Sequence, residues 1–521
     1  MKNYLNLIFI LIFCFMNYFS NTLIDALCPM RCNCNDERLI AFCNNSLLDV
    51  VPITLNPELK ELYLSNNQIK NIFSSFTVYR DLEVLDMTHN SMTSLGKKNF
   101  NLQNHLKVMS VSNNMITQIN NLTFYGLSSL HVLNLNDNLL QDLPFRVFAT
   151  LISLEKLDLS SNAINSVSPE AFSGLNNLKS LILRNNRLVR VPSVAFSHLP
   201  NLVKLDIGFN SFIEMPDYAF SSLMSLQELL LDSCSVTSIP ETAFLHLSHL
   251  RQLNLRDNHL TQIPTEALEN LKNLNELIIS GNRVQIITAF AFRGLTNLKV
   301  LEMSYLSQLS YIDRDALIEN VRLKKIVLEF NEKLKNVFIG TFDANSANLK
   351  YLSLRGNSME TLHSRLVQWQ RLDFLDIREN PFNCNCSLVW FWKFLKESNL
   401  TTKEYLESVV CAKPPNLMSH PLMSIPVSDL GCYESKNSQY LTTTLIVFTV
   451  CTICCIFVGL WCRTRLTYLM HKKQYEQSLY PALTDDITYE KGRIIDNQVM
   501  CSPTTAIMIK PPIRIAPITE L

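Results

Sequence analysis

Residues 59–69, LKELYLSNNQI, contain the pattern LxxLxLxxNxL, from which the architecture of the chain follows. Side chains alternate between the two faces of a strand, so the two leucines of LxL predict a short strand with one apolar face. Tyr63, between them, then points to the opposite face. Asn67 follows where the chain leaves the strand, and its amide can bond backbone groups that would otherwise be buried without partners.

This pattern recurs along most of the chain. Its first leucine returns at Leu59, Leu82, Leu106, Leu130, Leu154, Leu178, Leu202, Leu226, Leu250, Leu274, Leu298, Leu323, Leu349 and Leu372, which makes fourteen units about 24 residues apart. A second register contains Phe76, Phe100, Phe124, Phe148, Phe172, Phe196, Phe220, Phe244, Phe292 and Phe342, with Leu268 and Leu317 in place of Phe. A third contains Pro144, Pro192, Pro216, Pro240 and Pro264. One unit cannot bury its apolar faces alone, so the period predicts a stacked solenoid over residues 59–382.

The array has two irregularities. Cys234 replaces the recurring asparagine in the eighth repeat, and we interpret it as a structural residue rather than a reactive thiol. Leu306 stands at the same place in the eleventh repeat, and the eleventh and twelfth repeats are longer than the others. We therefore expect the solenoid to be locally irregular around Leu306.

Two apolar segments flank the array. Lys2 and the run of residues 5–19 predict a secretory signal peptide over residues 1–26, with an uncleaved anchor as the alternative. Residues 441–461 lack charges and are long enough to span a bilayer as a helix. Arg463, Arg465, Lys472 and Lys473 follow this segment, whereas the linker before it (433–440) contains only one basic residue, Lys436. The tail (462–521) is therefore expected in the cytosol and the array outside, at the plasma membrane.

The cysteines group at the two ends of the array. One tetrad, Cys28, Cys32, Cys34 and Cys43, falls in residues 27–58, and the other, Cys384, Cys386, Cys411 and Cys432, falls in residues 383–432. Each predicts a cap over an apolar end that would otherwise meet water. An exported chain favours disulfides over zinc ligation. Spacing alone leaves three pairings open for each tetrad.

In these features the chain resembles the extracellular leucine-rich-repeat family of the 24-residue type, found in single-pass cell-surface receptors and adhesion molecules. The resemblance implies an α/β repeat solenoid shaped as a horseshoe, with a parallel sheet on its concave side. It also implies the disulfides Cys28–Cys34, Cys32–Cys43, Cys384–Cys411 and Cys386–Cys432. Trp390, Phe391 and Trp392 would then plug the last repeat.

The residue between the two leucines of each strand should face solvent on the concave side. Most of these residues are polar, as Asp206 is, but Ile182, Leu230, Ile278 and Val327 are apolar and occupy every second repeat from the sixth to the twelfth. We interpret these four as the centre of a ligand-binding surface, with Arg184, Asp232, Arg256 and Glu329 as a charged rim. The alternative is that they are isolated surface aliphatic residues, which are common.

No catalytic motif appears in the sequence. It has no GxSxG, HExxH, phosphate-binding loop or GxGxxG, so we predict no enzymatic activity and no cofactor. Lys and Arg total 46 and Asp and Glu total 46, and this balance argues against nucleic acid as a partner.

Candidate modification and trafficking sites complete the prediction. Glycosylation is expected at Asn44, Asn121 and Asn399, and least at a fourth sequon, Asn385, which lies between two cysteines. In the tail, Tyr480 and Leu483 fit an endocytic signal, Cys462 fits palmitoylation, and Thr519 with Leu521 fits a ligand of a PDZ domain.

The expected function is that of a receptor or adhesion protein with an extracellular protein ligand and cytosolic adaptors. One alternative is an innate-immune recognition or accessory receptor, although the tail is too short for the signalling domain that resemblance to Toll-like receptors would imply. Another is an auxiliary channel subunit, in which the membrane helix makes the functional contact.

Overall fold

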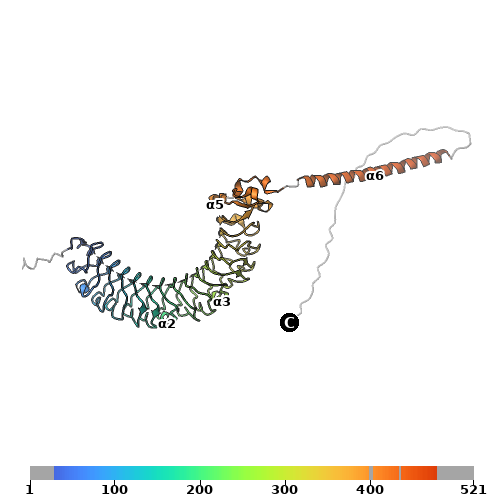
Figure 1. The fold of residues 1–521 in the computed structure, drawn as a ribbon. Coiled ribbons are helices and arrows are strands. Elements are labelled where there is room, and N and C mark those ends of the chain that lie inside the picture. The colour runs from blue at the N-terminus through green and yellow to red at the C-terminus, as the bar shows by residue number, and fades with distance from the viewer. Residues whose placement is uncertain (1–27, 398–402, 433–435, 478–521) are drawn as a thin grey trace, which may run out of the picture. The chain divides into compact units, whose positions relative to one another are not determined.

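The computed structural model describes residues 28–397, 403–432 and 436–477. The chain forms two compact units, Met1–Tyr433 and Glu434–Leu521. The first unit contains the repeats, which stack into an arc (Figure 1).

One sheet of sixteen strands runs through the first unit in chain order. Its strands are β1 (Asn33–Asn35), β2 (Ile40–Phe42), β3 (Glu61–Tyr63), β4 (Val84–Asp86), β5 (Val108–Ser110), β6 (Val132–Asn134), β8 (Lys156–Asp158), β10 (Ser180–Ile182), β11 (Lys204–Asp206), β12 (Glu228–Leu230), β13 (Gln252–Asn254), β14 (Glu276–Ile278), β16 (Val300–Glu302), β18 (Lys325–Val327), β19 (Tyr351–Ser353) and β20 (Phe374–Asp376). β1 and β2 pair antiparallel, and every later neighbour in this sheet is parallel. The predicted repeat solenoid is confirmed, and the cap adds two strands that the repeat pattern does not predict.

The opposite side of the solenoid is built mostly from turns. Its short elements are η1 (Ser75–Thr77), α2 (Ser193–Phe196), α3 (Thr265–Leu268), β7 (Asp142–Leu143), β9 (Ser166–Val167), β15 (Ile286–Ile287) and β17 (Tyr311–Ile312). Pro192 and Pro264 immediately precede α2 and α3. The phenylalanine register forms a buried column, in which successive rings from Phe124 to Phe244 lie 5.7–6.5 Å apart between centroids.

The recurring asparagines connect neighbouring repeats. Asn138 shows the arrangement, because its Nδ2 donates to the carbonyls of Val111 and Leu135 at 3.0 and 3.1 Å, and its Oδ1 accepts from the amide of Ile116 at 3.0 Å. Each such amide therefore satisfies backbone groups of two repeats at once.

The two substituted positions preserve the sheet. Cys234 is buried, its Sγ donates to the carbonyl of Ile207 at 3.2 Å, and burial raises the pKa of the thiol to about 12, as a structural cysteine requires. Leu306 is buried as well, and its amide donates to Asn331 Oδ1 at 2.8 Å. Strands β14, β16 and β18 keep their register beside it, so the expected irregularity does not reach the main sheet.

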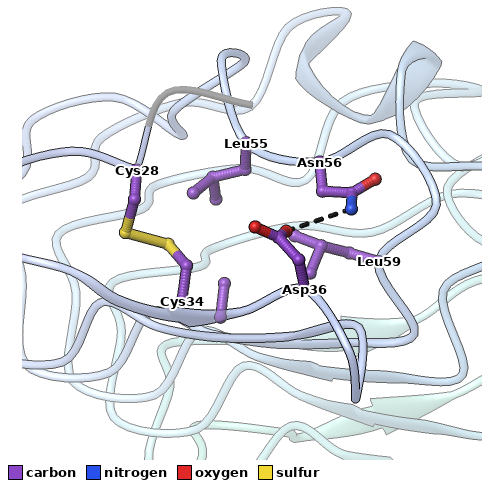
Figure 2. A pocket seen from close by; sticks show the side chains of 7 residues that line it. Cys28, Cys34, Asp36, Leu55, Asn56 and Leu59 are labelled. Carbon is purple, nitrogen blue, oxygen red and sulfur yellow. Dashed lines mark hydrogen bonds between the residues drawn. A yellow bond between two sulfur atoms is a disulfide. The ribbon is translucent and has the colours of Figure 1, made fainter. Parts of the chain in front are cut away.

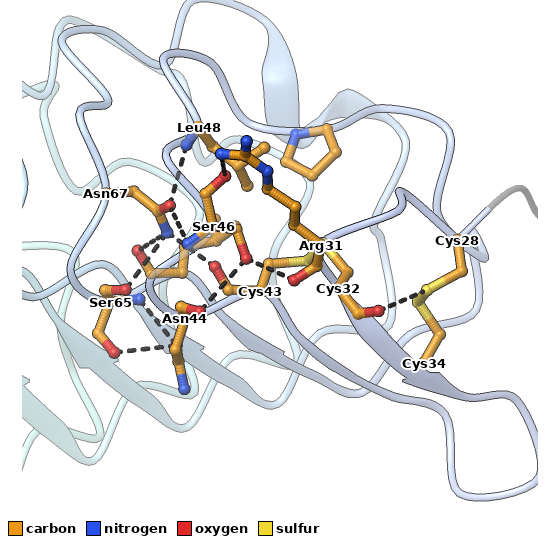
Figure 3. Close-up of a disulfide and its surroundings, with 12 residues drawn as sticks. Cys28, Arg31, Cys32, Cys34, Cys43, Asn44, Ser46, Leu48, Ser65 and Asn67 are labelled. Carbon is orange, nitrogen blue, oxygen red and sulfur yellow. Dashed lines mark hydrogen bonds between the residues drawn. A yellow bond between two sulfur atoms is a disulfide. The ribbon is translucent and has the colours of Figure 1, made fainter.

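The N-terminal cap covers the first repeat with the disulfides Cys28–Cys34 and Cys32–Cys43. Leu55 and Leu59 line a small pocket together with the first disulfide (Figure 2), and Asn56 Nδ2 donates to Asp36 Oδ1 at 3.0 Å in the same pocket. The cap joins the asparagine ladder, because Asn67 Oδ1 accepts from the amide of Ser46 at 3.0 Å (Figure 3).

The C-terminal cap contains β21 (Phe382–Asn383), α4 (Val389–Glu397), α5 (Lys403–Glu407) and β22 (Cys411–Lys413), with η2 (Trp369–Arg371) before it and the turns η3 (Cys386–Leu388), η4 (Pro415–Leu417), η5 (Leu422–Ser424) and η6 (Val427–Leu430) within it. Its disulfides are Cys384–Cys411 and Cys386–Cys432. All four disulfides have the pairing that the family resemblance implies.

Aromatic residues close the last repeat from this cap. Phe391 is buried, and its ring lies 5.9 Å from that of Trp369. Trp390 and Trp392 are only half-buried, and their indole N–H groups donate to the carbonyls of Leu362 and Ile425 at 3.3 and 3.0 Å. The plug therefore includes Trp369, which comes from before the cap.

The second unit contains α6 (Lys436–Gln477). Within it, Thr442–Lys472 is long and apolar enough to cross a membrane. This segment includes nearly all of the predicted span (441–461), and the helix continues beyond residue 461 through Arg463 and Arg465.

Candidate binding surface on the concave face

Three parallel rows of side chains face the concave side of the sheet. We call the first residue of each strand the strand-start row, the third residue the strand-end row, and the residue two positions later the exit row. In β14 these residues are Glu276, Ile278 and Ser280, whereas Leu277 between the first two is fully buried. The predicted apolar residues therefore belong to the strand-end row.

The four predicted apolar residues are less exposed than the sequence indicates. Ile182, Leu230 and Ile278 are half-buried. Val327 is only 8% exposed, so its interpretation as a solvent-facing residue is wrong. Glu302 lies directly opposite Val327 in the sheet and bonds Lys325 Nζ at 2.7 Å, and this pair of long side chains flanks the short valine.

The predicted charged rim is in part a buried ion cluster. Arg184 Nη2 lies 2.6 Å from Asp232 Oδ2, and Arg184 Nη1 lies 3.2 Å from Asp206 Oδ1. Both aspartates are only 7% exposed. Arg184 and Asp232 therefore bond each other instead of presenting free charges to a ligand.

Gly208 makes this long contact possible. Arg184 and Asp232 belong to the sixth and eighth repeats, and Gly208 occupies the exit row between them. A Cβ atom on Gly208 would lie 2.6 Å from Arg184 Nη1 and 2.9 Å from Asp232 Oδ1, closer than atoms can approach. Because Gly208 has no side chain, the guanidinium of Arg184 can extend past the seventh repeat to Asp232 in the eighth.

Electrostatics hold this cluster in place. The hydrogen bond to Asp232 raises the pKa of Arg184. Burial raises the pKa of Asp206 despite the nearby guanidinium. Burial thus disfavours the ionised form of Asp206. Asp232, in contrast, accepts two hydrogen bonds from Arg184, the bidentate arrangement typical of strong arginine–carboxylate pairs.

The other two predicted rim residues lie apart from this cluster. Arg256 Nε lies 3.3 Å from Asp257 Oδ2 at an exposed site. Glu329 Oε1 accepts from Ser353 Oγ at 2.5 Å. The structure therefore spreads the predicted ligand-binding residues along β10–β18 and joins only Arg184, Asp206 and Asp232 directly.

Glu276, in the strand-start row, is a residue that sequence reasoning missed. Its side chain is half-buried and makes no ion pair or hydrogen bond with any residue the structure describes, and burial raises its pKa. The charged neighbours in this part of the sheet are paired, as Lys204 with Glu228 at 2.6 Å shows. The sequence shows which charged residues occupy the strands, but it does not show how they pair, so it does not reveal that Glu276 has no cation bonded to it.

Aromatic side chains at the strained position before the recurring asparagine, or before Leu306 in its place, were also missed. Phe209, Tyr305 and Phe330 have φ angles of 52°, 56° and 54°, in the left-handed region that costs most residues about 1–2 kcal/mol. The equivalent residue in other repeats is usually Asn, Asp, Ser or Gly, of which Gly, Asn and Asp adopt this region most readily. Phe209 and Tyr305 are about half exposed, at 49% and 51%.

Arginines stack on two of these rings. Arg184 Cζ lies 4.5 Å from the centroid of Phe209, and Arg355 Cζ lies 5.3 Å from that of Phe330. Tyr305 stacks on Phe330 with centroids 5.0 Å apart. Aromatic and arginine side chains are enriched at the centres of protein interfaces.

The sequons lie on different surfaces. Asn44 follows β2 at a place equivalent to the exit row, so it lies at the N-terminal end of the concave face, and its Oδ1 accepts from the amide of Ser65 at 2.9 Å (Figure 3). Asn121 is exposed. Asn385 is exposed too, and its Oδ1 accepts from the amide of Ser387 at 2.9 Å.

Several predicted sites lie outside the described residues. They are the signal peptide, the sequon at Asn399, the endocytic signal at Tyr480 and the C-terminal Thr519 and Leu521. Among the residues that the structure does describe, no group of three or more His, Cys, Asp or Glu side chains could hold a metal ion.

Comparison with known proteins agrees with this architecture. The model of the family Leucine rich repeat matches residues 80–140, 128–188, 176–236, 224–284 and 272–332, and a second Leucine Rich Repeat model matches residues 58–78. Among curated proteins, the chain is similar to the NT-3 growth factor receptor of Gallus gallus (32% identical over 21% of this chain and 14% of that protein) and to human vasorin (31% over 19% and 15%). It is also similar to mouse trophoblast glycoprotein (28% over 26% and 32%). The chain thus matches less than a third of the length of each.

Solved structures share the fold over a longer stretch. A complex of TLR13 with single-stranded RNA matches 72% of this chain and 54% of that chain, with 26% identity and a TM-score of 0.58. The Toll–Spätzle complex of Drosophila matches 72% and 61%, with 20% identity and a TM-score of 0.57. With the recurring strands, the two disulfide caps and the apolar helix, these matches show that the chain belongs to the leucine-rich-repeat family, in the capped form that resembles membrane receptors.

Proposed function

We propose that the protein is a single-pass cell-surface receptor or adhesion protein that binds an extracellular protein through the concave face of repeats six to twelve. One observation carries this proposal. The half-buried Leu230 and Ile278 lie on the same face as the Arg184–Asp232 ion pair and the exposed rings of Phe209 and Tyr305. Such a surface has an apolar centre and already ordered polar groups, both of which favour protein association.

A protein ligand fits this surface better than a nucleic acid. The TLR13 complex contains RNA, so a nucleic-acid ligand is a relevant alternative. Phosphate recognition depends on clustered cations, however, and the cations at the centre of this face are bonded to carboxylates. Glu276 adds a negative charge without a partner.

The proposed orientation places the repeats outside the plasma membrane. Arg463 and Arg465 follow the apolar part of α6, and basic residues collect on the cytosolic side of membrane helices. Residues 462–521 would then form a cytosolic tail. We assign them to adaptor binding and traffic, with Thr519 and Leu521 as a ligand for a PDZ domain, which an added C-terminal glycine should abolish.

The decisive experiment changes the apolar centre without touching the core. Full-length protein on cells should lose binding to soluble cell-surface proteins in a screen when Leu230→Glu and Ile278→Glu are combined, while surface expression is retained. Ile152→Glu with Met224→Glu, at exposed sites outside the concave strands, is the matched control. Unchanged binding by the first variant would move the site to another surface.

The Toll-like receptors among the relatives favour one second candidate, an innate-immune accessory receptor. In that case the protein should co-purify from cells with a receptor that has its own signalling domain. Association with a pore protein instead, dependent on residues 442–461, would favour an auxiliary channel subunit. Cell aggregation driven by the full-length chain would favour adhesion.

A further inference from the structure

Glu276 lacks a partner at the centre of the proposed binding surface. It is the first residue of β14, and Ile278 follows on the same face of the same strand. No hydrogen bond or ion pair involves its carboxylate within the described parts of the chain, although the side chain is half-buried. A carboxylate that has lost water without gaining a cation is unfavourable.

In the part of the chain that the structure describes, no neighbouring cation bonds Glu276. Burial raises its pKa most, and repulsion from Glu302 raises the pKa by more than attraction to Lys325 lowers it. In the adjoining strands, Gln252 and Val300 lie directly opposite. Lys325, in the next strand beyond Val300, is held by Glu302 at 2.7 Å. On the other side, Lys204 is held by Glu228 at 2.6 Å.

The exit-row cations of the sixth and ninth repeats are paired as well. Arg184 is bonded to both Asp206 and Asp232, and Arg256 lies 3.3 Å from Asp257. The surface around Glu276 therefore has an excess of negative charge that the protein does not balance itself.

We propose that Glu276 binds a lysine or arginine side chain of the protein partner, while Leu230 and Ile278 contact apolar side chains next to that cation. This proposal rests on the function proposed above for the concave face. Charge complementarity identifies the partner, since a cation placed there gains an ion pair at a site that is already partly desolvated.

The spacing on β14 also specifies the partner segment. Glu276 and Ile278 are two residues apart on one strand, which separates them by about 6.6 Å. An extended segment has the same spacing between residues i and i+2. A basic residue and an apolar residue two positions apart in the partner would therefore reach Glu276 and Ile278 together.

A library of random linear peptides displayed on phage tests this recognition. Full-length protein in detergent micelles, immobilised through its C-terminal tail, should enrich peptides in which Lys or Arg occurs two positions from an apolar residue. Glu276→Gln should weaken the binding of these peptides about tenfold or more. Glu276→Lys should shift the selection toward Asp and Glu.

Glu266→Gln is the matched control, because Glu266 is an exposed carboxylate on α3, outside the concave face. Two outcomes would overturn the inference but leave the proposed site unaffected. In the first, the selected peptides depend on Leu230 and Ile278 but lack a basic residue. In the second, they bind the Glu276→Gln variant as well as the wild type. If no selected peptide is sensitive to Leu230→Glu with Ile278→Glu, the proposed site itself is wrong. These outcomes separate the two proposals.

Discussion

The concave face has two apolar regions that differ in their surroundings. Near the N-terminus, Phe42 stacks on Tyr63 in the strand-end row with centroids 4.9 Å apart. A stripe of half-buried valines, Val84, Val108 and Val132, lies in the strand-start row of the same region. The sequon at Asn44 lies in the exit row of this region, two residues after Phe42. The central region, around Leu230 and Ile278, instead has fixed ion pairs, an unpaired carboxylate and exposed aromatic rims.

The core beneath the two regions is the same. Leu133 in β6 and Leu253 in β13 are both fully buried at equivalent positions of their strands. The repeat therefore determines the backbone in both regions and leaves only the outward rows free to differ. Binding specificity should then reside in these rows and not in the core.

We expect the largest effect from a substitution that destabilises the capped solenoid, which supports both regions. Cys384→Ser breaks a cap disulfide, for which the loss of stability is typically about 2–5 kcal/mol, and exposes the end of the apolar column. We expect retention of the protein in the endoplasmic reticulum, measured by surface labelling. Cys462→Ser, outside the caps, is the control, and normal delivery of the Cys384 variant would contradict the capping role.

Core substitutions should not distinguish the two regions. Leu133→Ala and Leu253→Ala each remove a fully buried side chain, at a typical cost of about 2–5 kcal/mol. We expect the two variants to lose similar amounts of free energy of unfolding, measured by chemical denaturation monitored with circular dichroism. A large difference between the two variants would mean that the repeats do not support each other equally.

Surface substitutions, in contrast, should distinguish the two regions. Val108→Glu with Val132→Glu changes the N-terminal stripe as strongly as Leu230→Glu with Ile278→Glu changes the centre. We expect only the central pair to abolish binding of the partner in a cell-surface titration. Equal losses from both pairs would extend the interface along the whole concave face.

Much of this architecture could be predicted from the sequence. The period identifies the strands and the Phe column, since each depends on residues that recur at fixed spacing, and the two cysteine tetrads identify the caps. The site is harder to predict, because Val327 and Arg184 occupy outward positions and yet are covered or paired by side chains of other repeats. The exposure of Val327 and Arg184 depends on how side chains on neighbouring strands are oriented. The residue pattern of a single strand does not specify those orientations.

Gly208 offers a more local test of the central region. In Gly208→Ala the new methyl group would displace the guanidinium of Arg184, and the buried Asp232 would lose its bidentate partner. Leaving a buried charge unpaired should destabilise the protein by roughly 1–3 kcal/mol. Ser112→Ala, in the exit row of the N-terminal region, should have a smaller effect, since the side chain there is neutral. An unchanged unfolding midpoint for Gly208→Ala would show that the ion pair contributes little.

The smallest effect is expected at Asp206, and its sign is the informative quantity. Burial raises the folded-state pKa of Asp206 above its unfolded value. The folded protein then binds the proton more tightly, so this residue lowers stability as the pH rises through the interval between the two values. Asp206→Asn removes that penalty and leaves Arg184 bonded to Asp232. At pH 7 we expect the variant to equal the wild type or exceed it by up to about 1 kcal/mol, and the difference should vanish below about pH 4, where the unfolded chain is protonated as well. Asp232→Asn, which removes the bidentate partner, should instead be destabilising. Thermal unfolding at both pH values measures each variant, and a clear loss of stability in Asp206→Asn at pH 7 would mean that attraction to Arg184 outweighs the cost of burial.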